Sequence, residues 1–225
     1  MPTDLVGFVR AHTHLAPVAY VPEVHLHQAA EPVGLWELTE GEFRSEQPPP
    51  FWAFAWAGGQ ALARYLLDRP ETVAGRRVLD LATGSGLVAI AAARAGAAVV
   101  RAVDVDPVAA VAAGLNAEAN RVRLAVTAGD PLDGDHGDAQ VVLAGDVFYS
   151  EAMATRVLRF LLRAAADGAR VLVGDPDRAY LPRERCTELA GYQVPVPTAL
   201  ESVHTRHARV WQLRPPVRRP AAALA

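Results

Sequence analysis

Lysine is absent from this sequence: all 22 basic residues are arginines. The accompanying abundance of alanine indicates a compositional bias, so we draw no functional conclusion from the missing lysines. Cysteine is nearly absent as well, because Cys186 is the only one. A single cysteine excludes a disulfide framework within the chain and a metal site built from cysteines. We find no convincing set of metal ligands of any other kind.

Apolar runs long enough to cross a bilayer are also missing, because charged residues or glycine interrupt each one well short of ~18 residues. The first ten residues lack a cationic segment followed by a long apolar run, so no signal peptide is expected. The net charge of −3 gives no strong attraction to nucleic acid or anionic lipid. We therefore expect a cytoplasmic protein with no nucleic-acid or membrane partner.

The chain does contain enough apolar residues, 51% of the total, for a sizeable core. Its 225 residues fit one α/β domain with an N-terminal extension. A stiff polyproline stretch over 47–50 is the expected boundary. We predict an extension over 1–50, one domain over 51–214, and a disordered tail over 215–225.

The extension is expected to hold three elements: a helix over 5–10, an extended edge segment over 18–27, and a helical turn over 35–38. An aromatic cluster over 51–56 and a helix over 60–68 follow. Strands and helices then alternate. The predicted strands cover 77–81, 98–103, 124–127, 140–144 and 169–173, and the predicted helices cover 87–95, 107–120 and 151–165.

This alternation predicts a Rossmann-like α/β fold with a mostly parallel sheet and helices on both faces. The strand over 140–144 is continuously apolar, as expected for a strand buried on both faces. The last two segments, 192–196 and 204–213, are typical of an antiparallel pair. They bring the predicted sheet to seven strands.

A cofactor motif follows the first strand of this sheet. Asp80-Leu-Ala-Thr-Gly-Ser-Gly86 consists of a strand end, a turn of small residues and a helix start. Glycines such as Gly84 and Gly86 let the backbone approach a ligand, and the helix N-terminus offers free N–H groups. Asp104 ends the next strand twenty residues after Gly84, the spacing at which an acidic residue meets a ribose hydroxyl.

Two cofactors compete for this motif. Gly84-Ser-Gly86-Leu-Val-Ala89 formally satisfies the dinucleotide fingerprint, so NAD is the first rival. A carboxylate at Asp80 would repel a pyrophosphate at close range, whereas it suits a ligand that carries an ammonium and a sulfonium. The motif therefore favours S-adenosylmethionine, with S-adenosylhomocysteine as the product.

Acidic residues also follow the third and fourth strands. Asp130 is placed for the adenine amino group, with Pro131 or Leu132 against the ring, and Asp146 lies where the reactive end of the cofactor should be. The alternative for each loop aspartate is that it only caps a helix.

At two further segments the sequence resembles a known family. The segment 50–70, which contains Trp56-Ala-Gly58-Gly59, is similar to the segment before the cofactor motif in seven-β-strand protein lysine methyltransferases of the electron transfer flavoprotein β-subunit group. Gly145-Asp146-Val-Phe-Tyr149 resembles the D-x-x-Y motif of that wider family, and 174–178 also resembles this group. The likeness covers roughly 48–213.

The resemblance implies roles for individual residues. Trp56, Gly58, Thr83 and Gly145 would belong to the cofactor pocket, Gly84 and Gly86 would approach the methionine part, and Asp104 would bind the ribose. Asp146 and Tyr149 would be the catalytic pair that receives the target amine; simple packing is the alternative for Tyr149. Two departures are small residues: Ala82 where the family usually has glycine, and Ala57 where it often has proline.

The leading hypothesis is therefore methylation of protein lysines, with the electron transfer flavoprotein β subunit as a candidate partner. Because the chain has no lysine, such an enzyme cannot modify its own side chains. Methylation of a small-molecule amine and binding of S-adenosylmethionine without catalysis are the alternatives. An intact Asp146-x-x-Tyr149 argues against the non-catalytic one.

Overall fold

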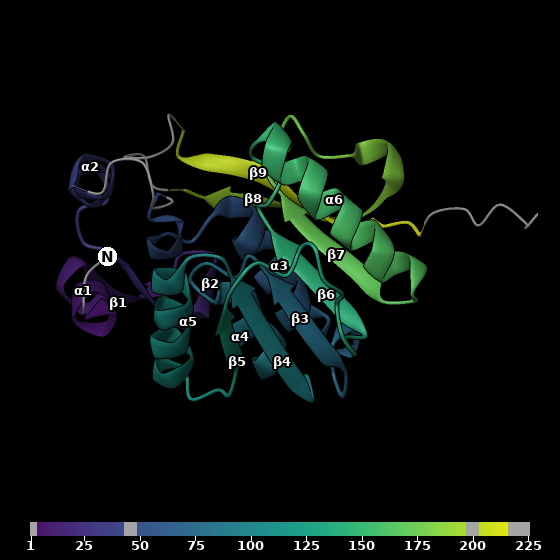
Figure 1. Ribbon diagram of the computed structural model, residues 1–225, viewed down its shortest axis with the longest axis horizontal. Helices are drawn as coiled ribbons and strands as arrows, with labels where there is room; N and C mark the ends of the chain where they lie inside the picture. Colours follow the sequence, from purple (N-terminus) through teal and green to yellow (C-terminus); the bar gives the residue numbers. More distant parts are fainter. Residues whose placement is uncertain (1–3, 43–48, 197–202, 216–225) are drawn as a thin grey trace, which may run out of the picture.

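A seven-stranded sheet forms the centre of the molecule in the computed structural model, which describes residues 4–42, 49–196 and 203–215 (Figure 1). The strand order is β5-β4-β3-β6-β7-β9-β8. The five parallel strands are β3 (Arg77–Leu81), β4 (Val99–Asp104), β5 (Ala125–Ala128), β6 (Val141–Gly145) and β7 (Arg170–Asp175). Strands β8 (Cys186–Pro195) and β9 (Thr205–Leu213) are antiparallel, so the predicted fold class is confirmed.

Helices cover both faces of this sheet. The amphipathic helix α6 (Glu151–Ala166) lies across β6 and β7 on one face, where Val142 and Val171 join its core cluster (Figure 1). Helices α3 (Ala57–Asp68) and α4 (Leu87–Arg94) pack on the other face, against Val141 and Leu172. Helix α5 (Pro107–Ala119) follows β4, with Asp106 as its N-cap. Because the central strands β6 and β7 are buried on both sides, they need no polar alternation.

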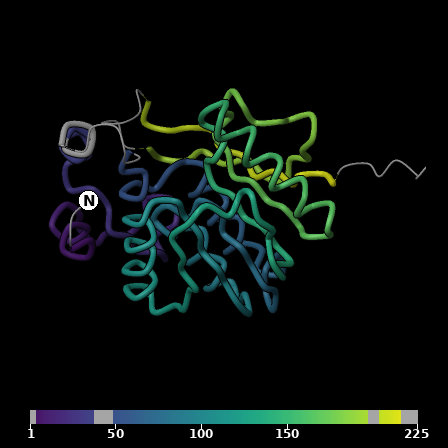
Figure 2. Tube along the Cα trace, viewed as in Figure 1, coloured from purple at the N-terminus to yellow at the C-terminus, as the bar shows by residue number. Residues whose placement is uncertain are grey.

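The N-terminal segment contributes α1 (Leu5–His12), the hairpin β1 (Thr13–Val18) and β2 (Val21–Ala29), and α2 (Pro32–Glu42). This segment lies beside α5 (Figure 2). Asn116 of α5 and its C-cap residue Asn120 accept hydrogen bonds from the backbone N–H groups of His27 and His25, at 2.7 and 3.0 Å. Asn120 also donates to the His25 carbonyl at 2.6 Å. Two helix side chains thus satisfy part of the free edge of β2.

Three predicted elements in the first seventy residues are corrected by the structure. The extended segment predicted over 18–27 starts too early, because the chain reverses after β1 and residues 21–27 belong to β2. The helical turn over 35–38 is part of the longer α2. Helix α3 starts at Ala57, not at residue 60, and includes two glycines. Glycine is unfavourable inside a helix, so the sequence pattern placed the start too late.

At the other end of the chain, β8 begins six residues earlier than the predicted strand over 192–196. The predicted tail lies outside the described residues, apart from Pro215. Within the described ranges, no helix combines the length and apolarity needed to cross a membrane.

Candidate active site

The carboxyl ends of β3, β4, β6 and β7 meet at one edge of the sheet and border a cavity of about 240 Å³. Open parallel sheets bind their ligands at this edge. The predicted site residues that line the cavity are Trp56, Thr83, Gly84, Asp104, Gly145, Asp146 and Tyr149. Those outside the lining are Gly58, Asp80, Gly86, Asp130 and Pro131.

The turn after β3 is held in a left-handed backbone conformation at three points, with φ of +53° at Ala82, +52° at Gly84 and +80° at Gly86. Glycine adopts this conformation without strain, whereas alanine does so at a cost. Ala82 therefore occupies a position that favours glycine. Gly86 serves a second purpose, because a Cβ there would lie 3.1 Å from the Ala113 Cβ of α5.

Asp80 lies beneath this turn and is only 1% exposed. Its carboxylate accepts hydrogen bonds from the Thr83 hydroxyl at 2.6 Å and from the Ala89 N–H of α4 at 3.1 Å. Burial raises the pKa of Asp80 to about 7. Thr83, not Asp80, lines the cavity, so the Asp80 carboxylate reaches the cavity only through the turn that it holds.

Asp104 and Asp106 present two more carboxylates at the end of β4. Asp104 accepts hydrogen bonds from the Gly84 N–H at 2.8 Å and from the Asp106 N–H at 3.0 Å, which ties the turn to β4. Asp106 accepts one from the Val108 N–H at 2.8 Å and caps α5. Burial raises the pKa of Asp104, and it raises that of Asp106 to about 6. Sequence reasoning missed Asp106, although its N-cap position before Pro107 was visible.

Asp146 follows β6 and also adopts a left-handed conformation, with φ of +59°. The Gly58 N–H donates to one carboxylate oxygen at 3.1 Å, and the Arg178 Nε donates to the other at 2.7 Å. Gly58 is packed so tightly that a Cβ would lie 2.4 Å from the Gly174 carbonyl oxygen. Its place is therefore behind the site, where it positions Asp146. Sequence reasoning missed the partner Arg178 because it lies 32 residues after Asp146, beyond helix α6 and strand β7.

Aromatic rings form the opposite wall. The side chains of Phe51, Trp52, Phe54 and Trp56 reach the cavity from the segment before α3. The Phe51 ring lies 5.3 Å from the Tyr149 ring and 5.8 Å from the Trp56 ring, measured between centroids. Tyr149 is 44% exposed, so it stands at the mouth and not in the core. Burial and the nearby charge of Asp104 raise the pKa of its hydroxyl.

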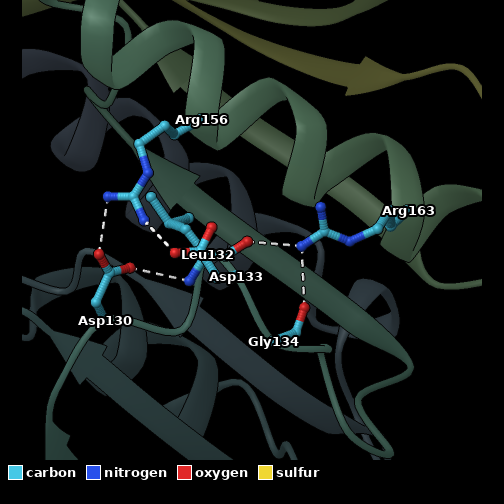
Figure 3. Close-up of polar contacts among 6 residues, drawn as sticks. All are labelled: Asp130, Leu132, Asp133, Gly134, Arg156 and Arg163. Carbon is cyan, nitrogen blue, oxygen red and sulfur yellow. Dashed lines mark hydrogen bonds and ion pairs between the residues drawn. The ribbon is translucent and has the colours of Figure 1, made fainter.

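Asp130 is engaged elsewhere, as Figure 3 shows. One of its carboxylate oxygens accepts from Arg156 of α6 at 2.8 Å, and the other accepts from the Leu132 N–H at 3.0 Å. Arg163 donates to the carbonyls of Leu132 and Gly134 (Figure 3). These contacts fix the loop after β5 onto α6. An adenine contact by Asp130 or Pro131 stays a prediction.

Comparisons with known proteins place this site in a family. Residues 61–154 match the model of the ribosomal protein L11 methyltransferase family (PrmA). The electron transfer flavoprotein beta subunit lysine methyltransferase of Danio rerio is 37% identical over 216 residues, which cover 93% of this chain and 83% of that protein. The Rattus norvegicus protein of the same name is 38% identical and covers 74% of this chain and 68% of its own length.

The chain belongs to the electron transfer flavoprotein beta subunit lysine methyltransferase family. It is an S-adenosylmethionine-dependent methyltransferase. The likeness to the Danio rerio protein extends beyond the predicted 48–213 into the N-terminal extension. A ribosomal protein L11 methylase structure from Lactobacillus delbrueckii subsp. bulgaricus superposes with a TM-score of 0.53 and 17% identity, covering 89% of this chain and 99% of that one, and so supports the fold.

The donor set of the cavity fits S-adenosylmethionine. Asp80, Asp104 and Asp106 lie in or under the wall, and burial has raised the pKa of each. Among the described lining residues, Arg178 is the one cationic side chain, and it is bound to Asp146. A ligand with a sulfonium and an ammonium supplies the positive charge that these carboxylates lack. This chemistry does not suit the pyrophosphate of NAD.

A pH dependence of cofactor binding follows. A bound cation lowers the raised pKa values of Asp80 and Asp106, from about 7 and about 6, so binding releases protons. Lowering the pH from 7 to 5.5 protonates these carboxylates in the free protein, and we expect the affinity to fall about ten-fold. Titration calorimetry at the two pH values measures the affinity for S-adenosylmethionine. S-adenosylhomocysteine, which lacks the sulfonium charge, is the matched control and should show a smaller fall; equal affinity for S-adenosylmethionine at both pH values contradicts the electrostatic account.

Proposed function

We propose that this enzyme methylates lysine side chains of a protein, and that its substrate is the β subunit of an electron transfer flavoprotein. The observation that carries the proposal is the joint position of Asp146 and Tyr149 in one cavity wall, facing the aromatic rings of Phe51 and Trp56. The names of the Danio rerio and Rattus norvegicus relatives support the same substrate.

The cavity suits the end of a linear, flexible side chain. Its wall is mostly aromatic and aliphatic, and Tyr149 stands at the mouth with 44% of its surface exposed. Lysine has an apolar stem that packs along such rings and an amine that reaches past them. An apolar channel also disfavours the charged ammonium, so it favours the neutral amine that reacts.

The chemistry needs little beyond positioning. S-adenosylmethionine supplies a methyl group on sulfur: the amine lone pair forms the new N–C bond, the S–C electron pair stays on sulfur, and the product ammonium loses a proton to water. Asp104 and the turn around Gly84 hold the cofactor side of the cavity. Asp146 accepts a hydrogen bond from the incoming amine, and the Tyr149 ring orients it. The aromatic wall excludes water.

The test incubates the enzyme with methyl-labelled S-adenosylmethionine and recombinant electron transfer flavoprotein from its own source organism. We expect label in the β subunit, and its loss when the modified lysine is replaced by arginine. Because the enzyme contains no lysine, labelling of its own lysine side chains cannot contribute to the signal. A parallel incubation with a lysate of the same organism tests the small-molecule alternative, and label that appears there only in small molecules would overturn the protein substrate. Tight cofactor binding with no transfer to any acceptor would overturn catalysis.

A further inference from the structure

Arg178 stands out in the cavity wall because of its charge. It is the one cation among the described lining residues, and its Nε lies 2.7 Å from the Asp146 Oδ1. The Asp146 side chain is 4% exposed and that of Arg178 is 27% exposed. The pair is therefore largely withdrawn from water, where an ion pair is strong and a lone charge is costly. Removing the arginine leaves a buried carboxylate in the wall.

The loop after β7 holds Arg178 in this place. Asp175, which is fully buried at the end of β7, accepts a hydrogen bond from the Arg178 backbone N–H at 2.7 Å. Asp177 pairs with Arg183 and Arg209, which ties the middle of the loop to the chain on either side. The backbone before the guanidinium is thus fixed at two aspartates, Asp175 and Asp177, so the approach of Arg178 to Asp146 is built into the loop.

The ion pair changes what Asp146 does to a target amine. One carboxylate oxygen of Asp146 accepts a hydrogen bond from Gly58, and the other accepts one from Arg178. Each oxygen keeps a further lone pair, which can accept a hydrogen bond from an N–H of the target amine. Without the guanidinium, the Asp146 carboxylate would stabilise the ammonium form of a lysine bound next to it and would raise the pKa of that lysine. The guanidinium cancels that charge while leaving the hydrogen-bond acceptor in place.

We infer that Arg178 is a positioning residue that fixes the Asp146 carboxylate and balances its charge, so that a target lysine binds as the neutral, reactive amine. The inference rests on the proposed function, because it assumes a lysine acceptor. Arg178 acts through Asp146 and takes no part in the transfer itself.

The variant Arg178→Gln tests this in full pH profiles of kcat and KM for the protein substrate. The unpaired Asp146 should hold the unreactive ammonium. We expect the acidic limb of the kcat profile to move about one unit to higher pH, kcat at pH 7 to fall about ten-fold, and kcat to recover on the alkaline side. KM should not rise, since the ammonium binds well. The other titratable or charged groups around the amine site are Asp104 and Asp106 at the end of β4, Tyr149 after β6, and Asp175 and Asp177 after β7.

Two further variants complete the design. Arg178→Lys keeps a cation and should return the acidic limb most of the way to its wild-type position. Arg185→Gln removes an exposed guanidinium beyond this loop, 3.8 Å from Glu184 and outside the cavity lining, and should leave the limb unmoved. An equal loss of kcat at every pH in Arg178→Gln, or an unchanged profile, overturns the inference while the proposed function stands. No transfer by the wild-type enzyme overturns both.

Discussion

Replacing Asp104 by alanine should weaken the binding of S-adenosylmethionine about 100-fold, which corresponds to about 2.7 kcal/mol. The Asp104 carboxylate ends β4 in the cavity wall and holds the Gly84 N–H and the Asp106 N–H at 2.8 and 3.0 Å. The substitution removes a charged acceptor and releases the turn that shapes the cofactor side of the cavity. Hydrogen bonds to charged groups contribute about 1.5–3 kcal/mol each, so the expected loss is within reach of this one side chain.

Titration calorimetry measures this affinity, and initial rates measure KM for the protein substrate, which should stay within about two-fold if Asp104 serves the cofactor. Asp133→Ala is the matched control: it removes a carboxylate whose side chain is 91% exposed and which pairs with Arg156. Unchanged cofactor affinity in Asp104→Ala would refute the assignment of the end of β4 to the ribose. Asp104→Asn keeps the size of the side chain and should lie between alanine and the wild type.

The second large effect is expected at Gly58, where alanine should lower the free energy of unfolding by about 2–3 kcal/mol. Its Cβ would lie 2.4 Å from the Gly174 carbonyl oxygen and 3.0 Å from the Asp146 N. Both are backbone atoms, which cannot move aside cheaply. For a chain of this size the melting temperature should fall by about 5–10 °C. Methyl transfer should fall as well, because the Gly58 N–H holds Asp146.

The adjacent residue provides the control for Gly58. A Cβ at Gly59 would meet nothing nearer than the Leu87 and Val88 side chains at 3.9 Å. Gly59 also lies within α3, where alanine is favoured over glycine by about 0.5–1 kcal/mol. Thermal unfolding should therefore shift in opposite directions in Gly58→Ala and Gly59→Ala. A rise in the melting temperature of both variants would show that helix propensity, and not the contact with Gly174, controls this end of α3.

Local sequence patterns were sufficient for most of the sheet. Strand β3 begins and ends at the predicted residues, and the positions of the turn after it and of Asp104 follow from the glycine pattern and the spacing. The errors lie where packing overrides propensity. The start of α3 was placed late because its two glycines look like a helix break, whereas Gly58 is there to let α3 approach β7.

The site shows the same division. Asp80 was predicted from its place at the end of a strand, but the side-chain direction that puts it under the turn, with Thr83 in between, depends on the contact with α4. Asp130 has the right place in the sequence, but Arg156 of α6 holds it (Figure 3). The sequence around Asp130 and the sequence around Arg156 contain no pattern that predicts their pairing.

The sequence by itself determined the strand–helix alternation, the methyltransferase cofactor motif and the Asp146-x-x-Tyr149 pair, because each depends on neighbours a few residues apart. The tertiary structure alone decided which carboxylates face the cavity and which cation balances them. Asp146, Gly58 and Arg178 come from three distant segments. Asp146 and Arg178 meet because the parallel strands β6 and β7 bring their carboxyl ends to one edge of the sheet, and Gly58 joins them from the start of α3.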